Sequence, residues 1–193
     1  RHIVRDDFII FSDNTTPDES TILYNGEEVT TLANKNLGNR FIHGYSIDGF
    51  SYFSRSLKLN GSLSYVKGDE NETYGPMPSI SPIFGTISGE YTKDKIKISA
   101  LYKFSGDKSP KDYSLGGEDG LEETPVITEN SNGIIYAGTP KWSDFSIYTN
   151  YDISEDVKIR IALTNIFDNH YRTFASGISA PGRSFQIGLY LKL

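Results

Sequence analysis

Apolar and polar residues alternate one by one along most of this chain. In the segment SLKLNGSLSYV, the residues Leu57, Leu59, Leu63 and Tyr65 share one parity, and the residues of the other parity are polar. The segments KIKISALYKF and VKIRIALTNI repeat this two-residue period. Side chains of a β-strand point alternately to opposite faces of the sheet, so the period predicts strands with one apolar and one polar face.

The alternation predicts eight strands. They are expected at residues 2–11, 36–53, 56–67, 82–92, 95–106, 142–153, 156–165 and 183–193. Three connections turn back within a few residues, after YFSRSL, YTKDKI and YDISEDV. The other connections are long and polar, at about residues 12–35, 68–81, 107–141 and 166–182.

The uneven length of the connections favours a membrane barrel. Loops longer than about 15 residues are uncommon in compact soluble domains, whereas outer-membrane barrels have short turns at one end and long loops at the other. Aromatic residues also stand beside the predicted short turns: Tyr52, Phe53, Tyr91 and Tyr151. Such rings are stable at a membrane interface. A soluble β-sandwich has the same alternation and is the competing interpretation.

Composition narrows the choice only in part. The 13 Tyr, 11 Phe and 18 Gly among 193 residues favour strands joined by turns. A helical membrane span is excluded, because no run of about 20 apolar residues occurs. With no Cys, a disulfide scaffold and a thiolate metal site are excluded. The net charge of −6 argues against nucleic acid as a partner.

The last segment, SFQIGLYLKL, ends on alternating apolar residues without a polar tail. Its order of Gln186, Gly188, Leu191 and Leu193 resembles the C-terminal signal by which outer-membrane barrel proteins are recognised for insertion. Many amphipathic strands would also fit this pattern, so the signal is moderately specific.

The preceding residues carry a more specific resemblance. Residues 162–193, ALTNIFDNHYRTFASGISAPGRSFQIGLYLKL, resemble the end of TonB-dependent outer-membrane receptors. In that family an N-(I/L)-F-D-x-x-Y segment follows the penultimate strand, and a Gly-Arg pair, here Gly182 and Arg183, enters the last one. The stretches GPMPSISPIFG, NKNLGNRFIHGYSIDG and GTPKWSDFSIYTNYDISEDVKIRIALTNIFD are similar to other strands of these receptors. The resemblance covers nearly everything after about residue 30.

The resemblance implies an all-β fold, in which residues 1–193 form the C-terminal part of an antiparallel transmembrane barrel. The family barrel has about 22 strands and a plugged lumen, so about eight strands are expected here, with the plug and the earlier strands elsewhere. The implied function is active transport across the Gram-negative outer membrane of a scarce nutrient, an iron complex such as a siderophore or haem. No cofactor and no catalytic activity are implied, and the sequence has no paired-His motif, G-x-S-x-G elbow or P-loop.

The implied partners are those of the whole receptor. They are outer-membrane lipid and lipopolysaccharide, the plug and N-terminal strands, the TonB complex, the barrel assembly machinery, and an extracellular or lipoprotein partner. The competing interpretation is a complete eight-stranded barrel with a structural or adhesion role. The two differ at the chain end: residues 183–193 keep an open edge in a receptor segment and pair with residues 2–11 in a small barrel.

Six basic residues are expected on the polar face near the short turns. This basic band consists of Lys58, Lys95, Lys97, Lys158, Arg160 and Lys192. Only Glu90 is expected to oppose it. Either the band is a hydrated pore lining, or it pairs with carboxylates of the missing plug.

The predicted long loops are acidic. Between Asp107 and Pro140, seven carboxylates stand against only Lys108 and Lys111. Such runs are ordinarily solvated loop faces. The alternative is a negative field that favours a basic partner, or divalent cations that bridge to lipopolysaccharide.

The last loop supplies the candidate ligand-binding residues. They are His170, Tyr171, Arg172 and Arg183. Of the three histidines, His43 is expected to face outward near the top of a strand and His2 lies at the edge of the chain, so His170 alone could reach a ligand. A single loop histidine is usually solvated, and no metal site is predicted.

Overall fold

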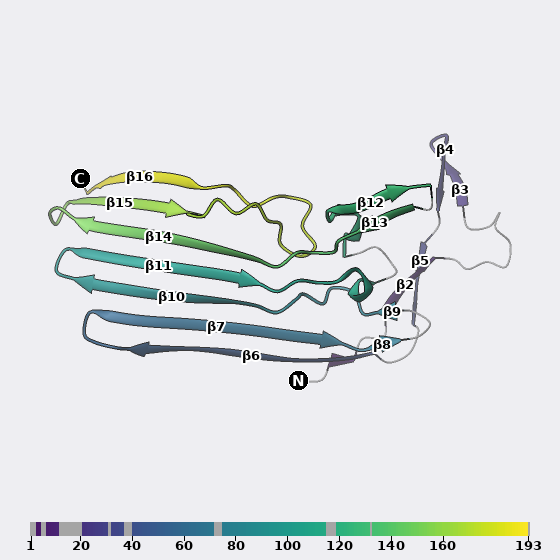
Figure 1. The fold of residues 1–193 in the computed structure, drawn as a ribbon, viewed down its shortest axis with the longest axis horizontal. Helices are drawn as coiled ribbons and strands as arrows, with labels where there is room; N and C mark the ends of the chain where they lie inside the picture. Colours follow the sequence, from purple (N-terminus) through teal and green to yellow (C-terminus); the bar gives the residue numbers. More distant parts are fainter. Residues whose placement is uncertain are drawn as a thin grey trace.

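The computed structural model of the chain describes residues 3–4, 7–11, 21–30, 32–36, 40–71, 75–114, 119–131 and 133–192. Its main element is one antiparallel sheet of eight strands in the order β1-β6-β7-β10-β11-β14-β15-β16 (Figure 1). The strands are β1 (Ile3–Val4), β6 (Phe41–Tyr52), β7 (Leu57–Gly68), β10 (Phe84–Lys93), β11 (Ile96–Ser105), β14 (Trp142–Asp152), β15 (Val157–Thr164) and β16 (Ser184–Leu191).

Helical structure is limited to single 3₁₀ turns in the described residues. These are η2 (Pro110–Asp112) and η3 (Leu121–Glu123). None of the described helices is long and apolar enough to cross a membrane. The prediction of an all-β antiparallel fold is therefore confirmed.

Seven of the eight strands lie where the alternation predicted them, and the first does not. The expected strand 2–11 is divided: β1 pairs with β6, whereas β2 (Asp7–Phe11) pairs with β5 (Leu32–Asn36) in a separate two-stranded sheet. Three consecutive charged residues, from Arg5 to Asp7, interrupt the alternation at this point. A strand that must keep one face apolar cannot run through them in register.

The short turns all lie at one end of the sheet, together with the end of β16, and the long connections lie at the other end (Figure 1). In the first and last of these turns a serine hydroxyl stabilises the reversal. Ser54 Oγ accepts from the amide of Leu57 at 3.1 Å, and Ser154 Oγ accepts from the amide of Asp156 at 3.3 Å. Serine commonly forms such local turns.

The long connections contain small hairpins that the sequence analysis did not expect. They are β3 (Thr21–Tyr24) with β4 (Glu27–Thr30), β8 (Glu70–Asn71) with β9 (Gly75–Pro76), and β12 (Val126–Asn130) with β13 (Gly133–Tyr136). A signal for the first was present. Asn25 and Gly26, both at positive φ (53° and 88°), form the Asn-Gly pair typical of a tight hairpin turn.

The two faces of the eight-stranded sheet differ in chemistry. On one face, apolar side chains stand opposite each other on neighbouring strands, as Ile87 does with Tyr102 and Ile161 with Ile187. Ile187 is 68% exposed. On the other face, hydroxyl groups bond across strands, for example Ser62 to Thr86 at 2.7 Å. A continuous exposed apolar face of this extent is unfavourable in water and suits contact with lipid.

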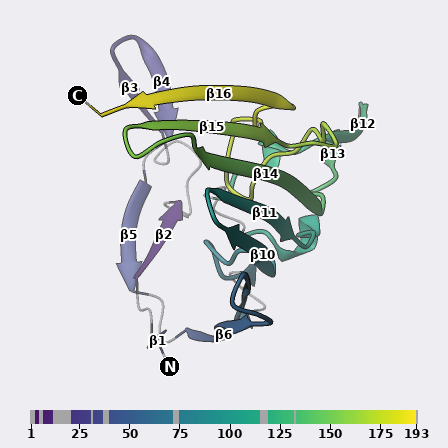
Figure 2. The same ribbon diagram turned by 90° about the vertical axis from the view of Figure 1, so that its left-hand side faces the viewer.

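The sheet is curved and open. Viewed from the end with the short turns, its strands follow an arc with β16 and β6 towards the two ends (Figure 2). β16 pairs with β15, and no described residue pairs with its other edge. The predicted open edge of the last strand is confirmed. The few buried apolar side chains, Met77 and Tyr113, lie in the long connections rather than in the sheet.

Candidate functional site

Lys108 joins three of the long connections. Its ammonium group donates to the Asp119 carboxylate at 3.0 Å and to the carbonyl oxygen of Ile80 at 2.6 Å. It also lies 4.0 Å from the ring centre of Phe174 and 5.0 Å from that of Tyr113, within the range of a cation–π interaction. Burial lowers the pKa of Lys108, and Asp119 opposes this shift. The loops are therefore held together around one buried ion pair.

The position of Asp119 corrects one part of the sequence interpretation. Asp119 was counted among the solvated acidic residues, yet it is only 2% exposed. It pairs with Lys108 and accepts from the amide of Ser79 at 2.7 Å. A buried carboxylate requires such partners. Glu122 and Glu123 are exposed as expected, and Glu118 lies outside the described residues.

Asn165 begins the N-I-F-D-x-x-Y segment and fixes the last loop. Its side-chain amide donates to the carbonyl oxygens of Asn169 at 2.9 Å and Pro181 at 3.0 Å. Its side-chain oxygen accepts from the amide of Asn169 at 3.0 Å. The residue is 2% exposed and has φ of 46°, a conformation that asparagine tolerates better than most residues. The motif therefore has a structural role in this chain.

Asp168 closes the base of the same loop. It also has positive φ (55°), and its carboxylate accepts from the amide of Arg183 at 2.7 Å. The Arg183 guanidinium lies 4.0 Å from the same carboxylate, and both side chains are exposed. Arg183, a predicted ligand-binding residue, thus pairs with Asp168. It does not line the cavity, described below, that His170, Tyr171 and Arg172 line.

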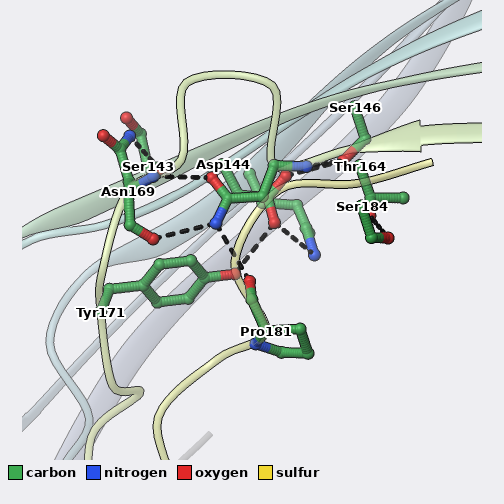
Figure 3. Close-up of polar contacts among 10 residues, drawn as sticks. Ser143, Asp144, Ser146, Thr164, Asn169, Tyr171, Pro181 and Ser184 are labelled. Carbon is green, nitrogen blue, oxygen red and sulfur yellow. Dashed lines mark hydrogen bonds and ion pairs between the residues drawn. The ribbon is translucent and has the colours of Figure 1, made fainter.

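Tyr171 is the most constrained of the predicted ligand-binding residues. Its hydroxyl donates to the Asp144 carboxylate at 3.0 Å (Figure 3). Its ring stacks on Trp142 with centroids 4.3 Å apart. Asp144 also accepts from Ser146 Oγ at 2.8 Å and lies 3.5 Å from the ammonium group of Lys103. Burial, with the Asp144 charge beside it, raises the pKa of Tyr171 to about 12.

A cavity of about 270 Å³ lies between the segment around residues 120–141 and the last loop. Its lining includes the predicted residues His170, Tyr171 and Arg172, together with Glu123 and Lys141. The structure thus brings together three of the four predicted ligand-binding residues. The volume lies just below the usual range for small-ligand pockets, which begins at about 300 Å³.

Arg172 and His170 share a hydrogen-bond partner on the last loop. Arg172 donates to the carbonyl oxygen of Glu123 at 2.8 Å and to Ser179 Oγ at 3.2 Å, while His170 Nε2 lies 3.0 Å from the same hydroxyl. Arg172, His170 and Lys141 are exposed. The site therefore presents several N–H donors to an acceptor-rich or anionic group. Among the described residues, no cluster of His, Asp and Glu could hold a metal ion.

The basic band is partly neutralised by the sheet itself. Lys97 binds Glu90 at 2.8 Å, as the sequence suggested, but Lys158 also lies 3.3 Å from Asp152. The expectation that only Glu90 opposes the band was therefore wrong, because Asp152 opposes it as well. Asp152 stands directly across from Lys158 in the β14–β15 register, which alternation within one strand does not reveal.

The other members of the basic band form no salt bridge with any described residue. Lys58 lies 4.7 Å from the ring centre of Phe50, and the Arg160 guanidinium lies 4.4 Å from that of Tyr190. Lys95 belongs to the turn after β10 and donates to the carbonyl oxygen of Ile153 at 3.0 Å. Lys192 follows β16 and is exposed.

The residues of the C-terminal signal lie on the last strand. Gln186 and Gly188 stand opposite Ala162 and Arg160, and Leu191 stands opposite Val157. Leu193 lies outside the described residues.

Sequence reasoning missed Asp144, Trp142 and Lys108. A sequence signal for Asp144 was present, because it is a carboxylate near the loop end of the expected strand 142–153. Trp142 and Lys108 had none, since their partners Tyr171 and Phe174 lie far away in sequence.

No protein-family model and no curated protein matches the chain. Solved structures do match it. The copper transporter OprC superposes with a TM-score of 0.62 at 18% identity, over 83% of this chain and 24% of OprC. The siderophore receptor PirA from Acinetobacter baumannii gives 0.60 at 16% identity, over 89% and 25%. The iron transporter FrpB from Neisseria meningitidis gives 0.59 at 13% identity, over 82% and 24%.

These similarities establish the fold. The chain has the fold of a segment of a TonB-dependent receptor barrel, as the sequence resemblance predicted. It spans about a quarter of the length of the structures that it matches. At such low identity the similarity extends to the fold alone.

Proposed function

We propose that this chain is part of a TonB-dependent receptor that actively imports a scarce nutrient across the outer membrane. The observation that carries the proposal is the open antiparallel sheet with one exposed apolar face. Its short turns and the end of β16 share one end, and its long loops share the other. Such a sheet is stable only as part of a closed barrel in lipid. The proposal assigns no catalytic step to these residues.

In this proposal the short turns face the periplasm, the loops face the outside and the polar face lines the lumen. The loop cavity then opens on the ligand's side of the membrane. Its donors, Arg172, His170 and Lys141, would attract an anionic ligand, and the stacked rings of Tyr171 and Trp142 lie next to them. We propose an iron complex of the siderophore or haem type as the cargo. The names of PirA and FrpB support this class, while that of OprC makes copper the alternative.

Growth and uptake would test the transport function. Cells that carry the whole receptor should take up one radiolabelled iron complex, and cells without the gene should not. Arg172→Gln should raise the half-saturating concentration of that complex. Arg183→Gln is the matched control, because Arg183 does not line the cavity. Equal growth of both strains on every iron and copper source would contradict the proposal and leave a structural or adhesion role.

We also propose that the basic band holds the plug. Among the described residues of the sheet, Lys58 and Arg160 are members of the band that form no salt bridge, and each lies over an aromatic ring. Carboxylates of a plug would be attracted to them in the lumen. Lys58 and Arg160 are the positions to reverse, and Lys97→Glu with Glu90→Lys, which keeps the internal pair, is the control. Unchanged uptake and unchanged plug retention after reversal of Lys58 and Arg160 would overturn this role.

A further inference from the structure

The apolar face of the sheet ends in a basic pair on the loop side. Along the β6–β7 ladder, the facing pairs change from aliphatic to aromatic and then to basic. The pairs in order are Ile47 with Leu63, Tyr45 with Tyr65, and His43 with Lys67. His43 and Lys67 are both exposed. One column of side chains therefore passes from apolar to cationic within two steps of the ladder.

No carboxylate neutralises this pair. Among the residues that the structure describes, neither His43 nor Lys67 forms a salt bridge. The acidic residue nearest to Lys67 in sequence is Asp69, which follows β7 and whose carboxylate binds Arg40 at 2.8 Å. A basic side chain on a lipid-facing surface is unfavourable unless it reaches an anionic or hydrated group. The pair therefore needs a partner from its surroundings.

The length of β7 places Lys67 at the level of the lipid headgroups. Lys67 stands ten residues beyond Leu57, the first residue of β7, or about 34 Å along an antiparallel strand. At a barrel tilt of about 40° this rise is about 26 Å, close to the apolar band of about 25 Å that outer-membrane barrels present. With Leu57 at one boundary of the band, Lys67 lies at the other. Tyr45 and Tyr65, one step earlier, then occupy the interface that such rings prefer.

We propose that Lys67, with His43 beside it, binds a phosphate group of the outer-leaflet lipid, lipopolysaccharide. The ammonium group is a compact cation that suits phosphate, and a phosphorylated lipid is the one abundant anion at that depth. The two tyrosines pack against the sugar and upper acyl region of the same molecule. This inference rests on the proposed function only for the placement of the barrel in the outer membrane with its loops outward.

Binding of purified lipopolysaccharide to the whole receptor in detergent would test the site, with native mass spectrometry counting the bound molecules. Lys67→Gln is expected to weaken binding about fivefold, the effect of one cation near an anionic membrane surface. His43→Gln should have a smaller effect. Lys93→Gln is the matched control, because Lys93 lies on the same face at the opposite end of the sheet and should leave binding unchanged.

The lipid itself can be varied to identify the group that binds. Dephosphorylated lipopolysaccharide should bind the unaltered receptor and Lys67→Gln equally, and excess inorganic phosphate should compete only weakly. Unchanged binding by Lys67→Gln, or an equal loss in Lys93→Gln, would overturn the inference. Uptake measured on the same variants separates the two proposals. If the unaltered receptor takes up the iron complex and Lys67→Gln binds lipopolysaccharide as well as it does, only the lipid site is refuted. If the unaltered receptor shows no uptake, only the transport function is refuted.

Discussion

Replacing Asn165 should release the last loop without unfolding the barrel. The Asn165 side chain makes three hydrogen bonds, to Asn169 twice and to Pro181, and is 2% exposed. Each such bond contributes about 1 kcal/mol, so Asn165→Ala removes about 3 kcal/mol. Alanine at φ of 46° adds about 1 kcal/mol of backbone strain. The total of about 4 kcal/mol corresponds to about a thousandfold increase in local opening.

A second substitution separates the two contributions. Asn165→Gly loses the same hydrogen bonds but relieves the backbone strain, because glycine adopts positive φ without cost. Its loop should therefore open about fivefold less often than that of Asn165→Ala. Asn169→Ala, which loses one side-chain bond to the carbonyl oxygen of Ser143, should cost about 1 kcal/mol.

Hydrogen exchange of the amides between residues 165 and 183, in the intact receptor, would measure these effects. Limited proteolysis of the same loop is an independent readout, and heat-resistant migration of the barrel serves as the control for folding. The reasoning fails if exchange in the loop is unchanged in Asn165→Ala. It also fails if Asn165→Gly and Asn165→Ala are indistinguishable while both differ from the unaltered chain.

Three further changes test the loop structure. Lys108→Met should leave Asp119 buried without its cation and make residues 107–140 sensitive to protease. The double variant Lys108→Met with Asp119→Leu should recover much of the protection from protease, because replacing both partners removes the uncompensated charge. Tyr171 has a folded-state pKa raised to about 12, so its contribution is complete below about pH 10 and is lost as the pH rises through 12; protection of the last loop should fall in that window, and Tyr171→Phe should abolish the fall. Trp142→Ala should remove the stacked partner of Tyr171 and lower the affinity for the imported complex, as measured by quenching of the receptor's intrinsic fluorescence or by isothermal titration.

The strands could be predicted from sequence because each strand has one apolar face. Apolar residues therefore recur at every second position of its sequence. That is why β7, β11 and β15 lie within two residues of their predicted bounds. The division of the expected strand 2–11 was missed because alternation says nothing about which partner a strand selects. β2 finds its partner in β5, within a connection that was expected to lack strands.

The candidate site was predictable only where a motif concentrated its residues. His170, Tyr171 and Arg172 are consecutive, so their common position in the cavity follows from one loop. Arg183 was separated from them because Asp168, at the base of that loop, binds it. The contacts that hold the loops around the cavity together join residues far apart in sequence, such as Lys108 with Phe174 and Asp144 with Tyr171. A buried charge in a loop cannot be told from a solvated one before its partner is known.

The β12–β13 hairpin has a practical consequence. Its base is closed by a backbone hydrogen bond from the amide of Ala137 to the carbonyl oxygen of Pro125 at 2.8 Å. The connection that carries the hairpin is closed in turn by a reciprocal backbone pair between Lys108 and Thr139, with N–O distances of 2.9 and 3.0 Å. The side chain of Lys108 anchors this connection to the neighbouring loops. The two strands of the hairpin pair with no other strand of the described chain. With the loops facing outward, as proposed above, a foreign peptide inserted between β12 and β13 is expected to be displayed on the cell surface, as an epitope tag or an affinity handle, and to leave the pairing of the eight-stranded sheet unchanged.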